Sequence, residues 1–458
     1  MTELPSGWVG STLAEVADWS SGGTPRSGTP EYYGGDVLWA VIGDLNDGRV
    51  FSTASTITVA GLDNSSAKVV EAGTVLVAMY GSIGKLGIAQ VPMATNQAIA
   101  CAAPSSAITR EWLFWWLRSQ RKHLLAAGKG GTQSNISQTV LKPWPIPLAP
   151  CAEQERIVAA IEEAFSKLDA GEAGLRTVRQ LLKRMRDAIL AAAVTGRLLP
   201  QDPTDTPATK LLADLGVEPV IDEHVPAAWA SARLAELANL VTDGDHRPPK
   251  RVPSGIPHLT AKNVRGGRFD LTGCSFVDDA GFAQTRSRYE PIAGDVIVTC
   301  VGTIGRVAVV PEGLTFSADR NLAAVRLRPV VEPQFAKLVL GSPAIQNWMA
   351  EASGSTAQPH LYLRDLRSIV VPVAPVEEQQ RIVAEVDRQM SFLNACERTI
   401  DAGLERSAAL RRTVLKAAFE GRLVEQDPTD EPASALLERI GAERAAAPRT
   451  VRRSRRTA

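Results

Sequence analysis

Two short glycine-containing stretches carry side chains that could hold phosphate. They read "GSIGKLGIA" at residues 81–89 and "GTIGRVAVV" at residues 302–310. A nucleotide-binding Walker A loop requires GxxxxGK followed by Ser or Thr, because its backbone wraps the phosphates and the hydroxyl holds magnesium. Met79 stands where the first glycine of that pattern should be, and Lys85 is followed by leucine. The second stretch has Arg306 in place of the lysine, so neither stretch predicts a nucleotide site.

Two interpretations of these stretches remain. In the first interpretation, each stretch is simply a tight hairpin turn between two buried strands, and its glycines supply positive φ. Alternatively, each turn also presents a hydroxyl and a cation to a nucleic acid, which is the combination that phosphate positioning needs. The side chains concerned are Ser82 and Lys85 in the first stretch and Thr303 and Arg306 in the second.

Two longer segments are more polar than a core requires. They begin "SGGTPRSGTPEYYGG" and "TDGDHRPPKRVPSG". Arg, Lys and Asn side chains pair with base edges and phosphates, although solvated loops would have the same composition. The candidate DNA contacts are Thr24, Arg26 and Asn46 in the first segment, and His246, Arg247, Lys250, Lys262 and Asn263 in the second.

A third pair of loops precedes two long helical segments. The loops read "GGTQSNIS" and "GSTAQPHLY". Their polar side chains could read bases, or could cap the turn and helix that follow. The candidates are Gln133, Asn135, Gln358 and His360.

The composition excludes several classes of protein. The 50 basic and 50 acidic residues give a net charge of zero, so only local patches could attract nucleic acid. The five cysteines form no CxxC pair and the five histidines are scattered, which indicates neither a disulfide framework nor a zinc site. No leader or long apolar run is visible, and we expect a cytoplasmic protein. Zincin, GxSxG and dinucleotide motifs are also missing, so we expect no catalytic activity.

The sequence contains an internal repeat. "LPSGWVGSTLAEVAD" corresponds to "VPAAWASARLAELAN", and the two glycine stretches correspond to each other. Further along, "APCAEQERIVAAI" corresponds to "APVEEQQRIVAEV", and "GRLLPQDPTD" to "GRLVEQDPTD". A repeat on this scale predicts two copies of one structural unit.

Each copy has a globular part followed by a long helix. Short apolar runs between turns predict an α+β fold, with two mixed α/β globular domains related by a pseudo-two-fold repeat. Apolar residues then recur at helical spacing, for example Ile157, Ile161 and Phe165, so the two long helices should cover each other as an antiparallel coiled coil. At 1.5 Å per residue, a helix of about 40 residues spans roughly 60 Å and could hold the globular domains apart. The predicted parts are globular domains at 1–150 and 226–375, spacer helices at 151–199 and 376–424, a linker at 200–225, and a C-terminal segment at 425–458 with a basic, disordered end.

This arrangement resembles the specificity subunits of type I restriction-modification systems. The resemblance covers nearly the whole chain and rests on "SGGTP…EYYGGDVLW…IGDLNDG", on "TDGDHRPPK…SGIPHLTAKNV", on "GSIGK" with "GTIGR", and on the repeated helical segments. It implies a subunit without an active site, in which each globular domain recognises one half of a bipartite double-stranded DNA site and the coiled coil fixes the gap. The candidate residues above would then contact DNA. A structural coiled-coil adaptor, or another nucleic-acid-binding scaffold, remains the alternative.

The resemblance also implies partners and cofactors. Two adenine methyltransferase (modification) subunits would dock on the chain, and two ATP-driven restriction subunits could join them. S-adenosylmethionine, ATP and magnesium would be bound by those partner subunits, and no cofactor is expected in this chain.

Overall fold

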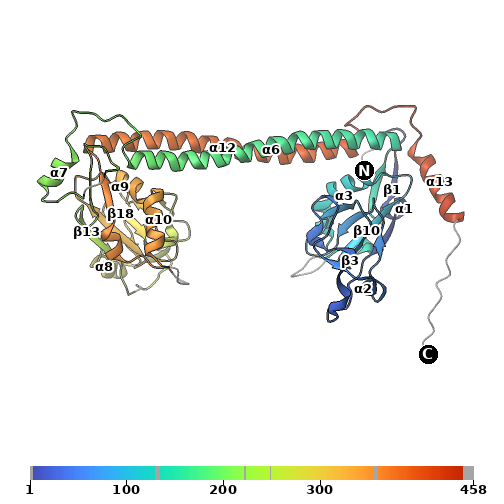
Figure 1. Ribbon diagram of the computed structural model, residues 1–458, viewed down its shortest axis with the longest axis horizontal. Coiled ribbons are helices and arrows are strands. Elements are labelled where there is room, and N and C mark those ends of the chain that lie inside the picture. Colours follow the sequence, from blue (N-terminus) through green and yellow to red (C-terminus); the bar gives the residue numbers. More distant parts are fainter. Residues whose placement is uncertain (1–3, 129–134, 221–222, 248, 355–358, 447–458) are drawn as a thin grey trace. The chain divides into compact units, whose positions relative to one another are not determined.

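The computed structural model describes residues 4–128, 135–220, 223–247, 249–354 and 359–446. The chain divides into two compact units, one formed by Met1–Gly174 with Ala402–Ala458 and the other by Leu175–Asp401. Each unit contains one globular domain and a part of both long helices (Figure 1). The two units are described separately below.

The first domain, which precedes the first long helix, is built on two mixed sheets. The larger sheet has the strand order β2-β10-β7-β8-β4, and the smaller has the order β5-β3-β9-β6. A separate antiparallel pair, β1 and β11, joins the two ends of the domain. The strands are β1 Val9–Thr12, β2 Ala17–Ser21, β3 Tyr33–Ala40, β4 Gly48–Val50, β5 Thr56–Ile57, β6 Val69–Val70, β7 Val75–Ala78, β8 Leu86–Ala89, β9 Met93–Thr95, β10 Ile99–Pro104 and β11 Pro145–Leu148. The helices are α1 Leu13–Val16, η1 Pro30–Tyr32, η2 Ile42–Asp44, α2 Val59–Asp63, α3 Arg110–Ser119, α4 Arg121–Ala127 and α5 Gln138–Leu141.

The second domain repeats this plan. Its main sheet has the order β13-β21-β18-β19, beside a three-stranded sheet β17-β14-β20, and the pair β12 and β22 joins its ends. The strands are β12 Ala230–Arg233, β13 Ala238–Asp243, β14 Ile256–Leu259, β15 Val264–Arg265, β16 Arg268–Phe269, β17 Ser275–Val277, β18 Val296–Thr299, β19 Val307–Val309, β20 Ser317–Ala318, β21 Leu322–Leu327 and β22 Val370–Val373. The helices are η3 Ala261–Asn263, α8 Asp279–Arg286, α9 Pro333–Leu340, α10 Pro343–Ala352 and α11 Leu363–Ser368.

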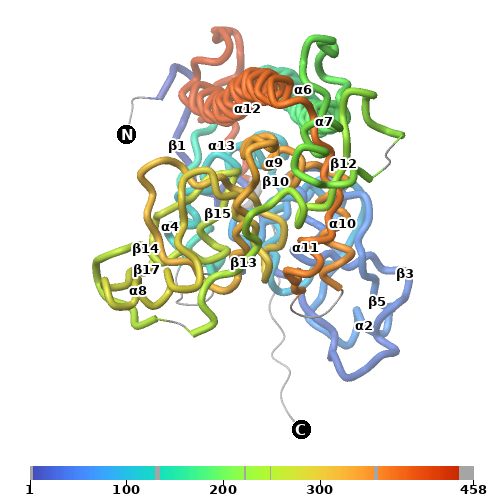
Figure 2. Tube along the Cα trace, turned by 90° about the vertical axis from the view of Figure 1, so that its left-hand side faces the viewer, coloured from blue at the N-terminus to red at the C-terminus, as the bar shows by residue number. Residues whose placement is uncertain are grey.

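The predicted long helices are α6 (Cys151–Val194) and α12 (Val376–Phe419), each of 44 residues. They lie side by side in both views (Figures 1 and 2). In the first unit, Arg411 of α12 donates to Asp169 at 2.7 Å while Ser407, one turn earlier, donates to Glu172 at 2.7 Å. The residue numbers in these contacts increase along α12 as they decrease along α6, so the two helices are antiparallel, as predicted.

The second unit pairs the helices in the same sense. Arg179 contacts Asp401, and Arg186 donates to Asn394 at 2.8 Å. Ile382, Val386 and Leu393 of α12 are buried along this part of the helix. The apolar stripe read from the sequence therefore covers the partner helix and the adjoining domain.

Each long helix ends five residues before the end of the segment predicted for it, at Val194 and at Phe419. The reason is a glycine in the left-handed region, Gly196 with φ 67° and Gly421 with φ 65°. A Cβ on Gly196 would lie 2.3 Å from Cγ of Pro226, and one on Gly421 would lie 2.4 Å from Cγ of Pro5. Both the φ angle and the close approach of a neighbouring proline require glycine at these positions.

The described part of the predicted linker, residues 200–220 and 223–225, includes a packed helix. It contains α7 (Ala208–Asp214), whose Ala208 and Leu212 are buried in the core of the second unit. Asp205 accepts a hydrogen bond from Arg381 at the start of α12, at 3.2 Å between Nη1 and Oδ1. This segment therefore completes the second domain.

The C-terminal segment completes the first domain in the same way. Asp430 pairs with Arg156 of α6 at 2.7 Å. In α13 (Ala433–Ala446), Leu436 and Ile440 are buried in the core that also contains Trp8. The prediction of a basic, disordered end concerns residues 447–458, which lie outside the described residues.

Candidate nucleic-acid interface

The two glycine stretches form the predicted hairpin turns. β7 pairs with β8 and β18 pairs with β19, both antiparallel, and the residues of β7, β8 and β18 are all buried. The φ angles are 62° at Gly81 and 74° at Gly84, and the corresponding glycines of the second turn are also positive. Ser82 and Thr303 are exposed at the tips of the turns. The hairpin interpretation is therefore confirmed, and it leaves the hydroxyls free to contact a ligand.

The two cations of the turns point back into their own domains. The ammonium of Lys85 donates to the carbonyl of Ile42 at 3.3 Å, and Arg306 Nη1 donates to the carbonyl of Val264 at 3.1 Å. Both side chains are half-buried. Each cation thus links its glycine turn to the 3-10 turn η2 or to the strand that follows η3, and its contact with DNA stays a prediction.

The loop before each long helix lies against the glycine turn. Tyr80 forms an antiparallel bridge with Asn135, and Val301 forms the equivalent bridge with His360. Asn135 is exposed and His360 is half-buried. Two segments that we predicted independently are therefore brought together in both domains. The remaining candidates of these loops, Gln133 and Gln358, lie outside the described residues.

A third segment joins the same surface in the first domain. The hydroxyl of Thr24 contacts the side-chain oxygen of Gln97, which lies on the turn between β9 and β10. The adjacent Ala98 carbonyl accepts a hydrogen bond from the N–H of Met79 at 2.8 Å, beside the glycine turn. Arg26 is exposed two residues after Thr24, and Asn46 is exposed shortly after η2.

The second domain brings the same three loops together. His246 and His360 line one cavity of about 720 Å³, together with Arg320 on the turn between β20 and β21. Arg247 and Lys250 are exposed just after His246, whereas Lys262 is exposed on η3 and does not line this cavity. Gly22 and Gly244 occupy equivalent positions in the two domains. A Cβ on Gly22 would clash with Thr95 at the end of β9, and a Cβ on Gly244 would clash with Ala318 at the end of β20. Thr24 and Gln97 therefore occupy the places of His246 and Arg320.

Asn263 corrects the sequence-based selection. Its side chain is 7 % exposed, accepts hydrogen bonds from the backbone and hydroxyl of Thr260, and donates to the carbonyl of Asp270 at 2.9 Å. The amide closes the capping box of η3 and is not presented at the surface. Lys262 in the same turn and Arg265 on β15 are exposed, and we omit Asn263 from the interface.

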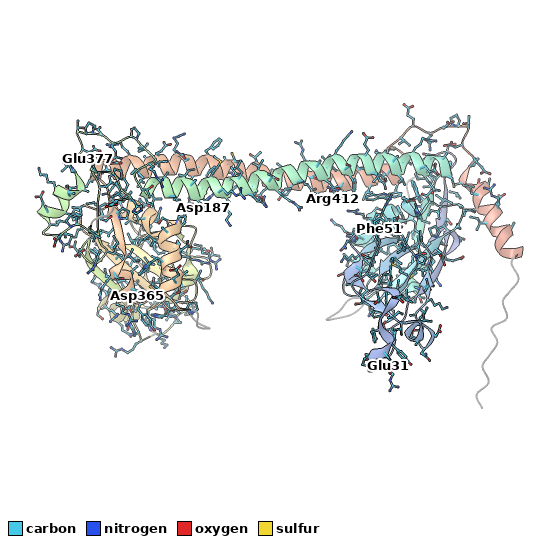
Figure 3. The ribbon with its side chains drawn as sticks, viewed as in Figure 1. Glu31, Phe51, Asp187, Asp365, Glu377 and Arg412 are labelled. Carbon is cyan, nitrogen blue, oxygen red and sulfur yellow. The ribbon has the colours of Figure 1, made fainter. Side chains whose placement is uncertain are left out.

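Sequence reasoning missed several side chains of this surface. Tyr362 is 50 % exposed, its ring lies 4.4 Å from that of His360, and the guanidinium of Arg364 stacks over it at 4.9 Å. Asp365, which is labelled in Figure 3, accepts a hydrogen bond from the Tyr362 N–H at 3.2 Å and so holds the start of α11. Gln97 and Arg320 were also missed, and aligning the turns after β9 and β20 across the two copies would have found them.

The acids of the second surface are already engaged. Asp243 binds His246 at 2.9 Å and also pairs with Arg288. Partial burial opposes ionisation of Asp245, but hydrogen bonds from the Arg247 backbone and from Gln284 lower its pKa. With these carboxylates paired, the net potential of the surface favours an anion.

Metal and membrane sites are not indicated in the described part of the chain. Its His, Cys, Asp and Glu side chains form no group of three or more that could hold a metal ion. None of its helices is long and apolar enough to span a bilayer.

Comparison with known proteins decides between the remaining interpretations. Residues 5–176 and 226–406 match the family described as "Type I restriction modification DNA specificity domain". The chain belongs to this type I restriction-modification specificity family. As a member of the specificity family it is a non-catalytic subunit that recognises DNA.

Individual relatives agree with this assignment. The chain is 31% identical over 335 residues to the type I restriction enzyme EcoBI specificity subunit of Escherichia coli, covering 69% of this chain and 68% of the relative. It is 25% identical over 469 residues to the EcoKI specificity subunit of Escherichia coli K12, covering 97% of each. Among solved structures, the HsdS subunit from Thermoanaerobacter tengcongensis has the same fold, with a TM-score of 0.54, 20% identity, and coverage of 92% of this chain and 98% of that one.

Proposed function

We propose that this specificity subunit reads a bipartite DNA site, one half with each globular domain. The observation that carries the proposal is the repeated meeting of three loops at one surface, with different side chains in the two copies. Threonine, glutamine and asparagine occupy the first surface at Thr24, Gln97 and Asn135. The equivalent places in the second surface carry His246, Arg320 and His360.

The chemistry of the two surfaces supports different half-sites. Amide and hydroxyl groups of the first surface suit base edges that both donate and accept, such as adenine. Arginine and histidine of the second surface suit acceptors such as guanine O6 and N7. Two unlike surfaces on one chain predict an asymmetric target.

The long helices support a role as scaffold for partner subunits. We propose that two adenine methyltransferase subunits dock on this chain, that S-adenosylmethionine is bound by them, and that ATP-dependent restriction subunits can join the assembly. The antiparallel pairing of α6 and α12 gives the chain two similar docking regions related by the repeat. The same helices would fix the number of unread base pairs between the half-sites.

The test is to co-express the chain with its modification subunits and map methylated adenines by sequencing. The expected result is one bipartite, asymmetric motif with a constant gap. A matched pair of variants, Thr24→Ala with Gln97→Ala and His246→Ala with Arg320→Ala, should relax opposite halves of that motif. A continuous motif, or a pair of variants that relaxes the same half, would contradict the proposal. If the chain were only a structural adaptor, neither pair of alanine variants would change the methylated motif.

A further inference from the structure

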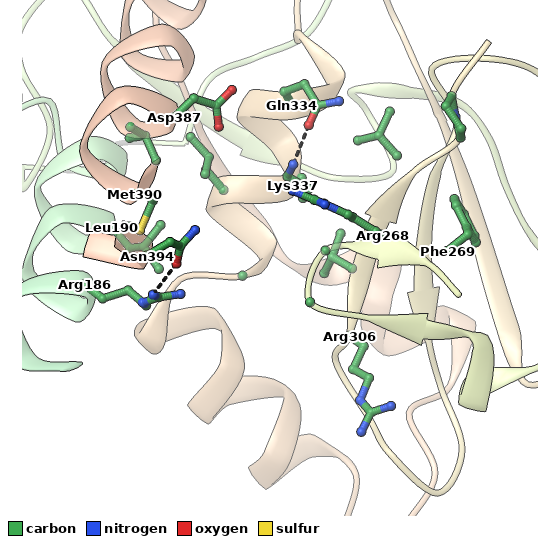
Figure 4. Close-up of a pocket in the computed structure, with 18 of the residues that line it drawn as sticks. Arg186, Leu190, Arg268, Phe269, Arg306, Gln334, Lys337, Asp387, Met390 and Asn394 are labelled. Carbon is green, nitrogen blue, oxygen red and sulfur yellow. Dashed lines mark hydrogen bonds between the residues drawn. The ribbon is translucent and has the colours of Figure 1, made fainter. Parts of the chain in front are cut away.

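The second unit contains a large cleft, one edge of which is the glycine turn at Gly305 and Arg306. It lies between α9, the β15–β16 hairpin and the two long helices, and its volume is about 1080 Å³ (Figure 4). Its apolar wall includes Leu190 and Met390 from the long helices and Phe269 and Leu338 from the domain. These side chains are only partly buried in the chain as it stands.

In the described part of the first unit, side chains of the protein itself occupy the equivalent place. Trp115 and Phe165 meet edge to face with ring centroids 4.8 Å apart, and both are nearly buried. The guanidinium of Arg118 lies 4.9 Å from the Trp115 ring and 5.5 Å from the Phe165 ring. Three large side chains therefore close the space between α3 and α6.

Two contacts fix the correspondence between the units. Trp112 of α3 packs edge to face on Trp8, and Phe335 of α9 packs edge to face on Trp229. With these helices aligned on Trp112 and Phe335, Trp115 corresponds to Leu338 and Arg118 to Gly341. Alignment of "EQERIVA" with "EQQRIVA" matches Phe165 with Met390. The cleft of the second unit is thus the volume that an indole, a phenyl ring and a guanidinium occupy in the first.

The charges around the cleft are unbalanced. Among the described residues that line it, four are cationic and one, Asp387, is acidic. Arg186 pairs with Glu397 at 3.3 Å, so the excess positive charge rests on Arg268, Arg306 and Lys337. A Cβ on Gly267, the residue before Arg268, would lie 4.0 Å from Cδ of Lys337, and Lys337 donates only to the neutral amide of Gln334 among the hydrogen bonds drawn in Figure 4. Like charges held together beside an apolar wall are stabilised by an anionic ligand.

We propose that this cleft binds an acidic segment of a partner protein that is anchored by an aromatic side chain. The aromatic group takes the volume filled by Trp115 and Phe165 in the first unit, and carboxylates pair with Arg268 and Lys337. A protein segment suits the cleft better than a DNA backbone, because phosphates gain nothing from the apolar wall formed by Leu190 and Met390. Among the described residues the aromatic filling is found in the first unit and the cleft in the second, so the site distinguishes the second unit from the first.

The test uses the full-length chain and a fluorescein-labelled peptide, DEWLED, measured by fluorescence anisotropy. Saturable binding is expected, with at least tenfold weaker affinity for the peptide DEALED, which lacks the aromatic ring. The double variant Leu338→Trp/Gly341→Arg installs the side chains of the first unit and should abolish binding. Charge reversal by Arg268→Glu/Lys337→Glu should weaken binding at least tenfold.

A matched control is the double variant Arg197→Glu/Lys210→Glu, which reverses two exposed cations of the second unit outside the cleft. This control should bind the peptide as the parent chain does, and melting curves should show that all variants are folded. Absence of saturable binding, or full binding by the filled variant, overturns the proposal. If a 20-base-pair duplex displaces the peptide and the filled variant loses DNA affinity instead, the cleft is a DNA contact and the proposal is wrong.

Discussion

The indole of Trp8 donates a hydrogen bond to the buried carboxylate of Glu153, with Nε1 and Oε2 3.0 Å apart. Trp229 makes the same bond to Glu378 at 2.9 Å. In each case the tryptophan follows the start of a globular domain and the glutamate lies in the first turn of a long helix. The bond therefore fixes the direction in which each helix leaves its domain.

Removing one of these carboxylates should destabilise the second unit. Glu378→Ala leaves the Trp229 N–H without its acceptor and takes the bond from Gln201, which donates to the same carboxylate at 2.7 Å. Loss of a buried partner costs about 1–3 kcal/mol of unfolding free energy. Denaturant unfolding measures the change, and Glu377→Ala is the control, because Glu377 is the exposed neighbour in the same turn (Figure 3). Equal losses for the two variants would refute this role.

The same carboxylate should make stability depend on pH. Burial raises the pKa of Glu378 above its ordinary value of 4.5, more than the bonds from Trp229 and Gln201 lower it. Its contribution to stability is therefore full below pH 4.5 and is lost as the pH rises through the raised pKa. Glu378→Gln removes the titration, so its unfolding free energy relative to the parent chain should rise between pH 4.5 and pH 7. Parallel stability curves would show that the group does not titrate in this way.

The C-terminal helix α13 should be needed for the stability of the first domain. Leu436 is 5% exposed in the core that contains Trp8. Leu436→Asp places a carboxylate in that core, and we expect a loss of about 3 kcal/mol or more. Differential scanning calorimetry should show an earlier transition for the first unit, whereas Glu438→Ala, on an exposed position of α13, should leave it unchanged. An unaltered transition in the Leu436 variant would mean that α13 is dispensable.

Arg320 should govern one half of the DNA site. Arg320→Ala, in the complex with modification subunits, should cost about 1–3 kcal/mol of DNA binding and relax the second half-site only. Gln97→Ala is the matched variant at the equivalent turn of the first domain. Uniform weakening across sequences, with a smaller salt dependence, would instead identify Arg320 as a phosphate contact.

Helix length should set the gap between the half-sites. Insertion of four residues, about 6 Å, into both α6 and α12 should lengthen the gap by one or two base pairs and leave both halves intact. Methylation mapping of the variant complex measures the gap. A changed half-site with a constant gap would argue against a spacer role.

Much of the fold was predictable because the internal repeat presents the same pattern of elements in two copies. The hairpin turns followed from glycines flanked by apolar runs, and the antiparallel helices from apolar residues at helical spacing. The docking of α13 was not predictable, since it depends on Leu436 and Ile440 meeting Trp8 from the other end of the chain. Their spacing alone does not say which core they enter.

The candidate interface was predicted less completely. Polar residues in loops identified the right segments, and the structure brings Asn135 and His360 beside the glycine turns. Residue type could not separate an exposed side chain from a capping one, which is why Asn263 was selected and Arg265 was passed over. Arg320 and Gln97 lie on short turns without a motif, so only their meeting with the other loops reveals them.

The placement of α13 has a consequence for the order in which the protein is made. A ribosome finishes residues 4–148 of the first domain early, yet the core of that domain still lacks Leu436 and Ile440 until α13 has emerged. The second unit, by contrast, is complete as soon as α12 has been synthesised through Asp401. The domain that is translated first is therefore completed after the second, and a chain stopped before α13 would carry an incomplete first domain.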